Sequence, residues 1–213
     1  RRNNVSHADL RHMRSELTEQ KVGDKTVSMT RAERMAVYAY WLRDESRNKM
    51  ISNGLKLERA KGIAGRYLVE GGQPANAKIA VNDIIKSLTA VERKIVETGV
   101  VAVSLMQKTA NAATRIIFGY DKFTQTGYSY PMRVNLDEQQ RNLDPVLTAH
   151  KWLEQAGFAK DTVPHGNALF VPDYFGAIHK HIDEMSTLAA LMVPIRNALK
   201  LLGHPAMRSW LIY

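Results

Sequence analysis

Residues 89–119 read TAVERKIVETGVVAVSLMQKTANAATRIIFG and contain the longest helix signal in the chain. Thr89 and Glu92 form a capping box, in which the hydroxyl accepts the third amide of the helix and the carboxylate accepts the cap amide. Apolar residues recur at helical spacing up to Gly119, a residue type that commonly ends helices. The stretch therefore predicts a central core helix of about 28 residues. Its apolar stripe comprises Ile95, Val96, Val100, Val103, Met106, Ala110, Ala113 and Ile117.

The other helix signals lie on both sides of this stretch. Thr30 and Glu33 form a second capping box, and the helix it opens is expected to end before Asn53 and Gly54. Weaker patterns predict helices over residues 6–19 and 76–88. Asp144 caps a helix expected to reach residue 157, and Asp173 caps the last major one. Pro194 must bend or break that last helix, because its ring removes one intrahelical hydrogen bond.

The segments between these helices lack helical periodicity. Residues 120–144 and 159–172 are expected to be two ordered loop excursions, and residues 22–27 a small hairpin or a loop. No convincing alternating strand pattern occurs outside the loops. The sequence therefore predicts an all-α fold: an irregular multi-helix bundle with one long central helix and two ordered loop excursions.

The chain of 213 residues is expected to form one continuous domain with two parts. Residues 1–72 form a basic helical N-terminal part and residues 73–213 the core of the helical bundle. The sequence begins with RRNN and finishes on the apolar run SWLIY. We interpret both ends as cuts in a longer polypeptide.

Composition excludes several classes of chemistry. The absence of cysteine rules out a disulfide framework, a thiolate metal site and a cysteine nucleophile. No apolar run approaches the roughly 20 residues that span a bilayer, and the longest candidate, residues 188–193, ends at Pro194. We therefore predict no transmembrane segment.

The net charge of +9 is concentrated in the first part of the chain, where residues 1–70 carry 15 Lys and Arg against 9 Asp and Glu. Such a part can face nucleic acid, anionic lipid or an acidic partner. A mixed-charge solvated surface is the favoured interpretation, because acidic residues are interspersed throughout. The candidate nucleic-acid-binding residues are Arg31, Arg34, Arg43, Arg47, Lys49, Lys56, Arg59, Lys61 and Arg66.

Candidate catalytic and metal sites are weak. The chain has no H-E-x-x-H, G-x-S-x-G or Walker-type motif. In the run HKHIDE (179–184), His179 and Asp183 share a helix face while His181 points away, so only two ligands converge and a surface His–Asp hydrogen bond is favoured. Among the aromatics, Tyr38 and Trp41 are expected in the core and Tyr40 at the surface. We predict no catalytic residues, no metal and no cofactor.

Three stretches taken together resemble a helical domain of the large polyvalent proteins of tailed phages, prophages and other mobile elements. They are the helix with MTRAE (29–33), YAYWL (38–42) and SNG (52–54); the helix from Leu88 followed by GYSYPM (127–132); and residues 181–202 followed by PAM (205–207). In that family a tyrosine-proline-hydrophobic turn packs back on the bundle, a role that Tyr130, Pro131 and Met132 fit. The structural anchors are thus Thr30, Glu33, Thr89, Glu92, Tyr130, Pro131 and Pro194.

The resemblance implies a non-enzymatic structural or docking domain of a co-injected virion protein, located in the virion interior and in the host cytoplasm after delivery. Its partners would be other domains of the same long chain, other virion or ejection proteins, and DNA. The alternative is a nucleic-acid-binding module of a phage or mobile-element enzyme, such as a virion polymerase or an antirestriction protein. A third option is a helical enzyme domain whose site includes His179 and Asp183.

Overall fold

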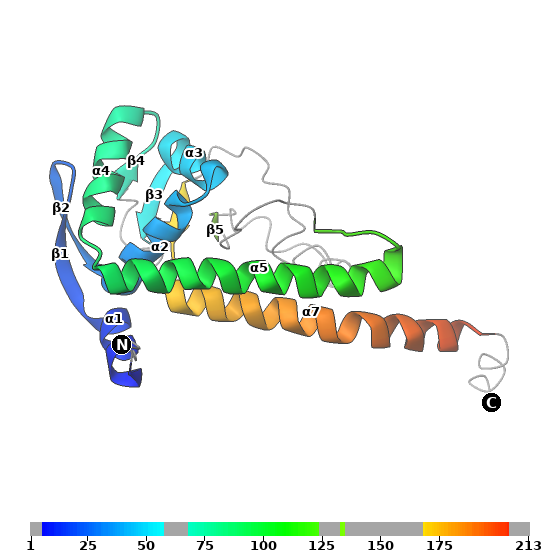
Figure 1. Cartoon of the computed structure of the whole chain (residues 1–213). Coiled ribbons are helices and arrows are strands. Elements are labelled where there is room, and N and C mark those ends of the chain that lie inside the picture. Colours follow the sequence, from blue (N-terminus) through cyan, green and yellow to red (C-terminus); the bar gives the residue numbers. More distant parts are fainter. Residues whose placement is uncertain (1–5, 58–67, 124–132, 135–167, 205–213) are drawn as a thin grey trace.

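The computed structural model describes residues 6–57, 68–123, 133–134 and 168–204. Figure 1 shows a body built mainly from residues 6–57 and 68–89 and, running out from it, two long helices that lie side by side. The helices are α1 (His7–Ser15), α2 (Arg31–Trp41), α3 (Asp44–Asn53), α4 (Pro74–Lys86), α5 (Ala90–Phe118) and α7 (Tyr174–Gly203).

The prediction of an all-α fold is wrong. About 70% of the described residues are helical, but two small sheets are also present. Most of the strands are only two to four residues long, too short to show the alternation that marks a strand in a sequence. The strands are β1 (Leu17–Val22), β2 (Lys25–Thr30), β3 (Gly54–Leu57), β4 (Val69–Glu70), β5 (Arg133–Val134) and β6 (Leu169–Val171).

Strands β1 and β2 form a hairpin with Leu17 opposite Thr30 and Val22 opposite Lys25. The two connecting residues begin with Gly23, whose φ of 60° lies in the left-handed region that tight hairpin turns require. Of the two structures that the sequence left open for residues 22–27, the hairpin is present. The helix expected over residues 6–19 ends at Ser15, because the hairpin begins at Leu17.

The second sheet has the strand order β4-β3-β6-β5. Its central pair is parallel, with Leu55 opposite Leu169 and Leu57 opposite Val171. The side chains of Leu55, Leu169 and Val171 are buried. The sheet therefore joins the two predicted parts of the chain, whose described residues share one core.

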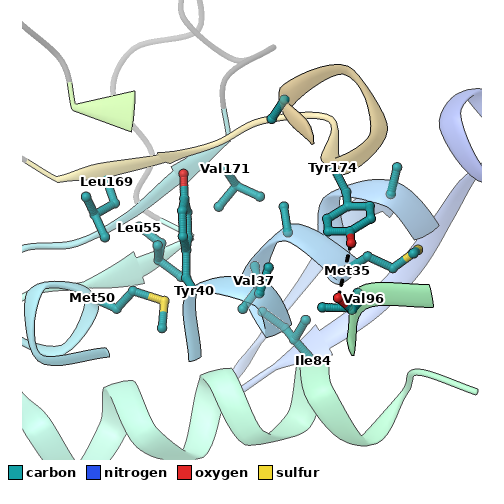
Figure 2. Packing of buried hydrophobic residues seen from close by; sticks show 14 of the residues in the cluster. Met35, Val37, Tyr40, Met50, Leu55, Ile84, Val96, Leu169, Val171 and Tyr174 are labelled. Atoms are coloured by element: carbon teal, nitrogen blue, oxygen red, sulfur yellow. Dashed lines mark hydrogen bonds between the residues drawn. The ribbon is translucent and has the colours of Figure 1, made fainter. Parts of the chain in front are cut away.

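Helix α2 lies in the middle of that core, with eight of its eleven residues buried. It contacts α1, α3, α4, α5, α7 and both sheets. Tyr40 is fully buried among Met50, Leu55 and Leu169 (Figure 2). Its hydroxyl donates to the carbonyl oxygen of Phe170 at 2.9 Å. The prediction that Tyr40 lies at the surface is therefore wrong, because a helix covered on nearly all sides has no single apolar stripe.

The two capping boxes form as predicted. Thr30 and Glu33 cap α2, and Thr89 and Glu92 cap α5, with both reciprocal hydrogen bonds present in each. The helix expected up to Asn53 divides into α2 and α3, and Gly54 ends the second of them with a φ of 82°. Helix α5 spans 29 residues and ends at Gly119, which has a φ of 80°. The predicted long central helix is thus confirmed.

Helix α7 begins after Asp173, whose side chain accepts hydrogen bonds from the amides of Phe175 and Gly176, and continues to Gly203. Pro194 does not break the helix. Pro194 has no amide hydrogen to donate to the carbonyl of Ala190, four residues earlier. Ala190 is exposed, so water can bond to that carbonyl instead. Tyr130, Pro131 and the helix expected over residues 145–157 lie outside the described residues.

We expect the Tyr40→Phe substitution to lower the free energy of unfolding by about 1–2 kcal/mol, because it removes a buried hydrogen bond to the Phe170 carbonyl without changing the ring. Urea unfolding followed by circular dichroism measures this. Tyr120→Phe is the matched control, since Tyr120 is 60% exposed. Equal stability of the two variants would show that the bond from Tyr40 contributes nothing.

Candidate docking surface on helices α5 and α7

Glu92 fixes the start of α5. Its side chain is 2% exposed and accepts hydrogen bonds from the amide of Thr89 at 2.7 Å and from Nε of Arg31 at 2.6 Å. Burial by itself would raise the pKa of Glu92, but the hydrogen bonds from Thr89 and the Arg31 guanidinium outweigh it and hold the pKa below its usual value. The capping residue of α5 is therefore also bonded to the first turn of α2.

Arg34, one turn further along α2, is buried as well. Its guanidinium donates to the hydroxyl of Thr18 on β1 at 2.9 Å and to that of Ser87 after α4 at 3.4 Å. Burial lowers the pKa of Arg34 from its usual value. Arg31 and Arg34, two of the predicted nucleic-acid-binding residues, are thus engaged within the body.

The other predicted cations are spread over α3, β3 and segments that are not described. Arg43 pairs with Glu45, and Arg47 pairs with Asp44 and lies over the ring of Trp41. Burial lowers the pKa of Lys49. Lys56 is half-buried in β3, whereas Arg59, Lys61 and Arg66 lie outside the described residues. The structure does not bring the described cations together on one open face.

Helices α5 and α7 run parallel in contact with each other (Figure 1). Residues about 80 positions apart meet along their length: the Tyr174 hydroxyl and the Val96 carbonyl, Ser186 and Met106, and Arg196 and the Ile116 carbonyl. The last of these is a 2.6 Å hydrogen bond from the guanidinium. The constant offset shows that the two helices stay in register from the body to their outer ends.

Gly99 allows the close approach of the two helices at their inner end. A Cβ atom at this position would lie 2.1 Å from the Tyr174 hydroxyl oxygen, far inside van der Waals contact. The Tyr174 side chain is 2% exposed, and burial raises its pKa above the usual value. Any larger residue at position 99 must therefore displace a buried aromatic ring.

At the outer end of α5 the chain turns back after Gly119. The side-chain amides of Gln107 and Asn111 both donate to the backbone carbonyl of Phe123, at 3.0 and 2.8 Å. The Phe123 ring is buried. Arg115 pairs with Asp121, with one of their hydrogen bonds at 2.6 Å. Residues 119–123 are thereby held against the last turns of the helix.

A shallow groove of about 410 Å³ lies between α5 and α7. Most of its surface is apolar, and small residues form much of the floor. It is lined by Met106, Thr109, Ala112, Ala113 and Ile116 on α5 and by Ser186, Ala189, Ala190 and Val193 on α7.

Large apolar side chains are exposed along both helices of the pair. On α5 they lie outside the stripe expected to form the core, and the sequence pattern did not identify the exposed residues of either helix as a site. The signal was present, however, because both helices carry more apolar residues than one buried face can hold. The exposed residues are Val91, Val101, Leu105, Ile116 and Phe118 on α5, and Leu191, Ile195, Leu199, Leu201 and Leu202 on α7.

His181 on α7 lies apart from His179 and Asp183, as the spacing predicted, but the expected hydrogen bond between His179 and Asp183 is not present. His181 is 2% exposed, whereas His179 and Asp183 are at the surface. Burial lowers the pKa of His181 from 6.5 to about 4. Within the described ranges, no group of three or more His, Cys, Asp or Glu residues could hold a metal ion.

A second cleft, of about 270 Å³, lies between the hairpin turn, β4 and α4. Its rim carries the ion pair of Lys25 and Glu70 at 2.8 Å, and both side chains are exposed. Gly23 at its edge donates its amide to Asp83. These polar groups bond mainly to each other, so the cleft supports a function less well than the groove does.

No protein-family model, curated protein or solved structure matches this chain. The resemblance to polyvalent proteins therefore stays a prediction.

By length and composition, residues Tyr174–Leu202 of α7 could cross a membrane, and only 17% of the most apolar 18-residue window is buried. Core helices of soluble proteins can pass the same test, so the expected lack of a transmembrane segment also stays a prediction.

We expect Gly99→Ala to lower the free energy of unfolding by about 1–3 kcal/mol, because the new methyl group collides with the Tyr174 hydroxyl. In a Tyr174→Phe background that atom is gone, and the same substitution should be neutral or stabilise by up to about 1 kcal/mol through helix propensity. Urea unfolding of the four proteins measures the coupling. Equal costs in both backgrounds would contradict the close approach.

We expect stability to fall as the pH drops from about 6.5 toward 4. The unfolded chain binds a proton at His181 near its ordinary pKa of 6.5, whereas the folded chain resists protonation down to about 4. Full stability is thus present above the unfolded pKa, and up to about 3 kcal/mol is lost below it. Urea unfolding at several pH values measures the slope, which His181→Phe should reduce. The exposed-site variant His179→Phe should retain it, and identical slopes in both variants would contradict the assignment.

Proposed function

We propose that this chain is a non-enzymatic docking domain of a large virion-associated protein of phages, prophages or other mobile elements, and that it docks through the groove between α5 and α7. The resemblance described for the sequence suggests the setting. The observation that carries the docking role is the mainly apolar groove between the paired helices, with the exposed Ile116 on its α5 side. Apolar grooves left open at the surface commonly serve as binding sites.

The groove fits a third helix. Ala112 and Ala113 on one wall and Ala189 and Ala190 on the other leave room for large side chains of an incoming helix. Ridges of side chains on one helix pack into such grooves between others. A helix contributed by another domain of the same long polypeptide, or by another virion protein, is the partner we propose.

The paired helices are held rigidly enough to present such a groove. The Thr89 cap and the Arg31–Glu92 ion pair fix the start of α5 to the body. The Arg196 hydrogen bond to the Ile116 carbonyl joins the two helices near their outer ends. A docking partner would therefore meet a surface that already has its bound shape, which reduces the entropy lost on association.

The alternative of a nucleic-acid-binding module receives less support. Among its described candidate cations, Arg31, Arg43 and Arg47 are in ion pairs, and Arg34 is buried. A protein that neutralises several phosphates loses affinity steeply as salt rises. Tight binding of duplex DNA with such a salt dependence would favour the alternative over the docking domain.

Site-specific photocrosslinking tests the proposal in the whole polypeptide that the gene encodes. A photoreactive residue in place of Ala190, in the groove, should crosslink to a defined segment of the same polypeptide or of another virion protein, identified by mass spectrometry. The control position is Lys78, which is exposed on α4 outside the groove. Equal crosslinking from both positions, or none from the groove, would contradict the docking role.

A further inference from the structure

The C-terminal half of α7 carries an exposed apolar face distinct from the groove. Leu191, Ile195, Leu199 and Leu202 are 42%, 49%, 63% and 47% exposed. Their spacing of four, four and three residues places them on one side of the helix. Ala190 and Val193, which line the groove, lie on a different side by the same helical geometry.

The charges around this face are mostly positive, and the one nearby carboxylate of the described outer end of α5, that of Asp121, is paired with Arg115. Residues 185–204 contain no Asp or Glu but include Arg196 and Lys200. The outer end of α5 lies beside the same region, because Arg196 bonds to the Ile116 carbonyl, and it adds Lys122 and the exposed aromatics Phe118 and Tyr120. Exposed apolar residues, cations and interfacial aromatics are the combination that anionic membrane surfaces attract.

We propose that this half of α7 lies in the interface of an anionic lipid bilayer, with Leu191, Ile195, Leu199 and Leu202 inserted among the acyl chains and Arg196 and Lys200 at the lipid phosphates. This proposal rests on the proposed function, because it names the partner of the outer end of the docking surface. The groove still binds a protein helix. Residues 185–202 would extend about 27 Å along the membrane plane.

An in-plane position fits the residues better than a crossing does. A crossing helix would place Arg196 and Lys200 within the hydrocarbon, at a cost that lying in the plane avoids. In the plane, Arg196 and Lys200 lie on one flank of the apolar face, each about 100° around the helix from the apolar residue before it, and their long side chains reach the headgroups from that flank.

A second copy of the chain fits this face less well. It would bring Arg196, Lys200 and Lys122 of each copy close to the same cations of the other, with no acidic residue in positions 185–204 to balance them. An acidic helix of another protein remains an outcome that the experiment separates from lipid.

The absence of cysteine makes a single-site fluorescent label straightforward. Leu199→Cys carrying an environment-sensitive dye should brighten and shift to the blue with equimolar phosphatidylglycerol and phosphatidylcholine vesicles, but not with pure phosphatidylcholine vesicles. The control is Asn82→Cys with the same dye, because Asn82 is exposed on α4. Its emission should stay unchanged with both vesicles.

Charge variants test the electrostatic part. Lys200→Gln should weaken affinity for the anionic vesicles about five-fold, and Arg196→Gln with Lys200→Gln about 30-fold, since each cation near the surface contributes about a factor of five. Lys78→Gln with Lys86→Gln removes two exposed charges from α4 and should leave affinity nearly unchanged. Thermal unfolding checks that each variant is folded. The single variant Lys200→Gln leaves the hydrogen bond from Arg196 to the Ile116 carbonyl intact.

Three results would overturn the proposal. They are no dye response at position 199 with anionic vesicles, an equal response with neutral vesicles, and a response that grows with protein concentration when vesicles are absent, which would indicate a second copy on this face. If the dye shows no insertion and an acidic helical peptide displaces the vesicles, the face is assigned to a protein partner. Crosslinking from the groove at position 190 is independent of all these outcomes, so failure of lipid binding leaves the docking function standing.

Discussion

The buried carboxylate of Glu92 is the group on which the arrangement of the helices depends. It closes the capping box that starts α5, and it accepts a hydrogen bond from Arg31 in the first turn of α2. A carboxylate in this position must be bonded, since an unpaired buried charge is strongly destabilising. The bond fixes where α5 leaves the body, and α7 then follows α5 in register. The groove and the outer apolar face depend on this contact together with the packing of Tyr174 against α5 at the inner end of the helix pair.

Local signals predicted the helices well. Reciprocal side-chain caps at Thr30 and Thr89 and the turns at Gly54 and Gly119 depend on neighbouring residues only, and each is present. The mixed sheet could not be predicted in this way, because its central pairing joins residue 55 to residue 169 and its strands are very short. Tyr40 was misplaced for a related reason. Its burial comes from β6, which is distant in sequence, and a stripe drawn on α2 alone cannot show that contact.

The candidate site was less predictable than the fold. Counting Lys and Arg identified a basic part of the chain, but charge counts do not show that Arg31 and Arg43 face carboxylates or that Arg34 is enclosed. The exposed apolar residues of α5 and α7 were visible in the sequence as residues in excess of one stripe. The stripe predicted for α5 already placed Val103 in the core, but only the pairing of the two helices shows that Leu105 and Leu199 remain exposed.

The parallel direction of α5 and α7 has a consequence for how the chain folds. Parallel neighbours cannot be joined by a short turn, and the contacts between them link residues 78 to 80 positions apart. Closing so long a loop costs entropy before any contact compensates for it, and contacts of large sequence separation form slowly. The hairpin and helices α1 to α4 can assemble from near neighbours in the sequence. We expect the pairing of β6 with β3 and the association of α7 with α5 to come later in folding, because both need residues that are distant in the sequence.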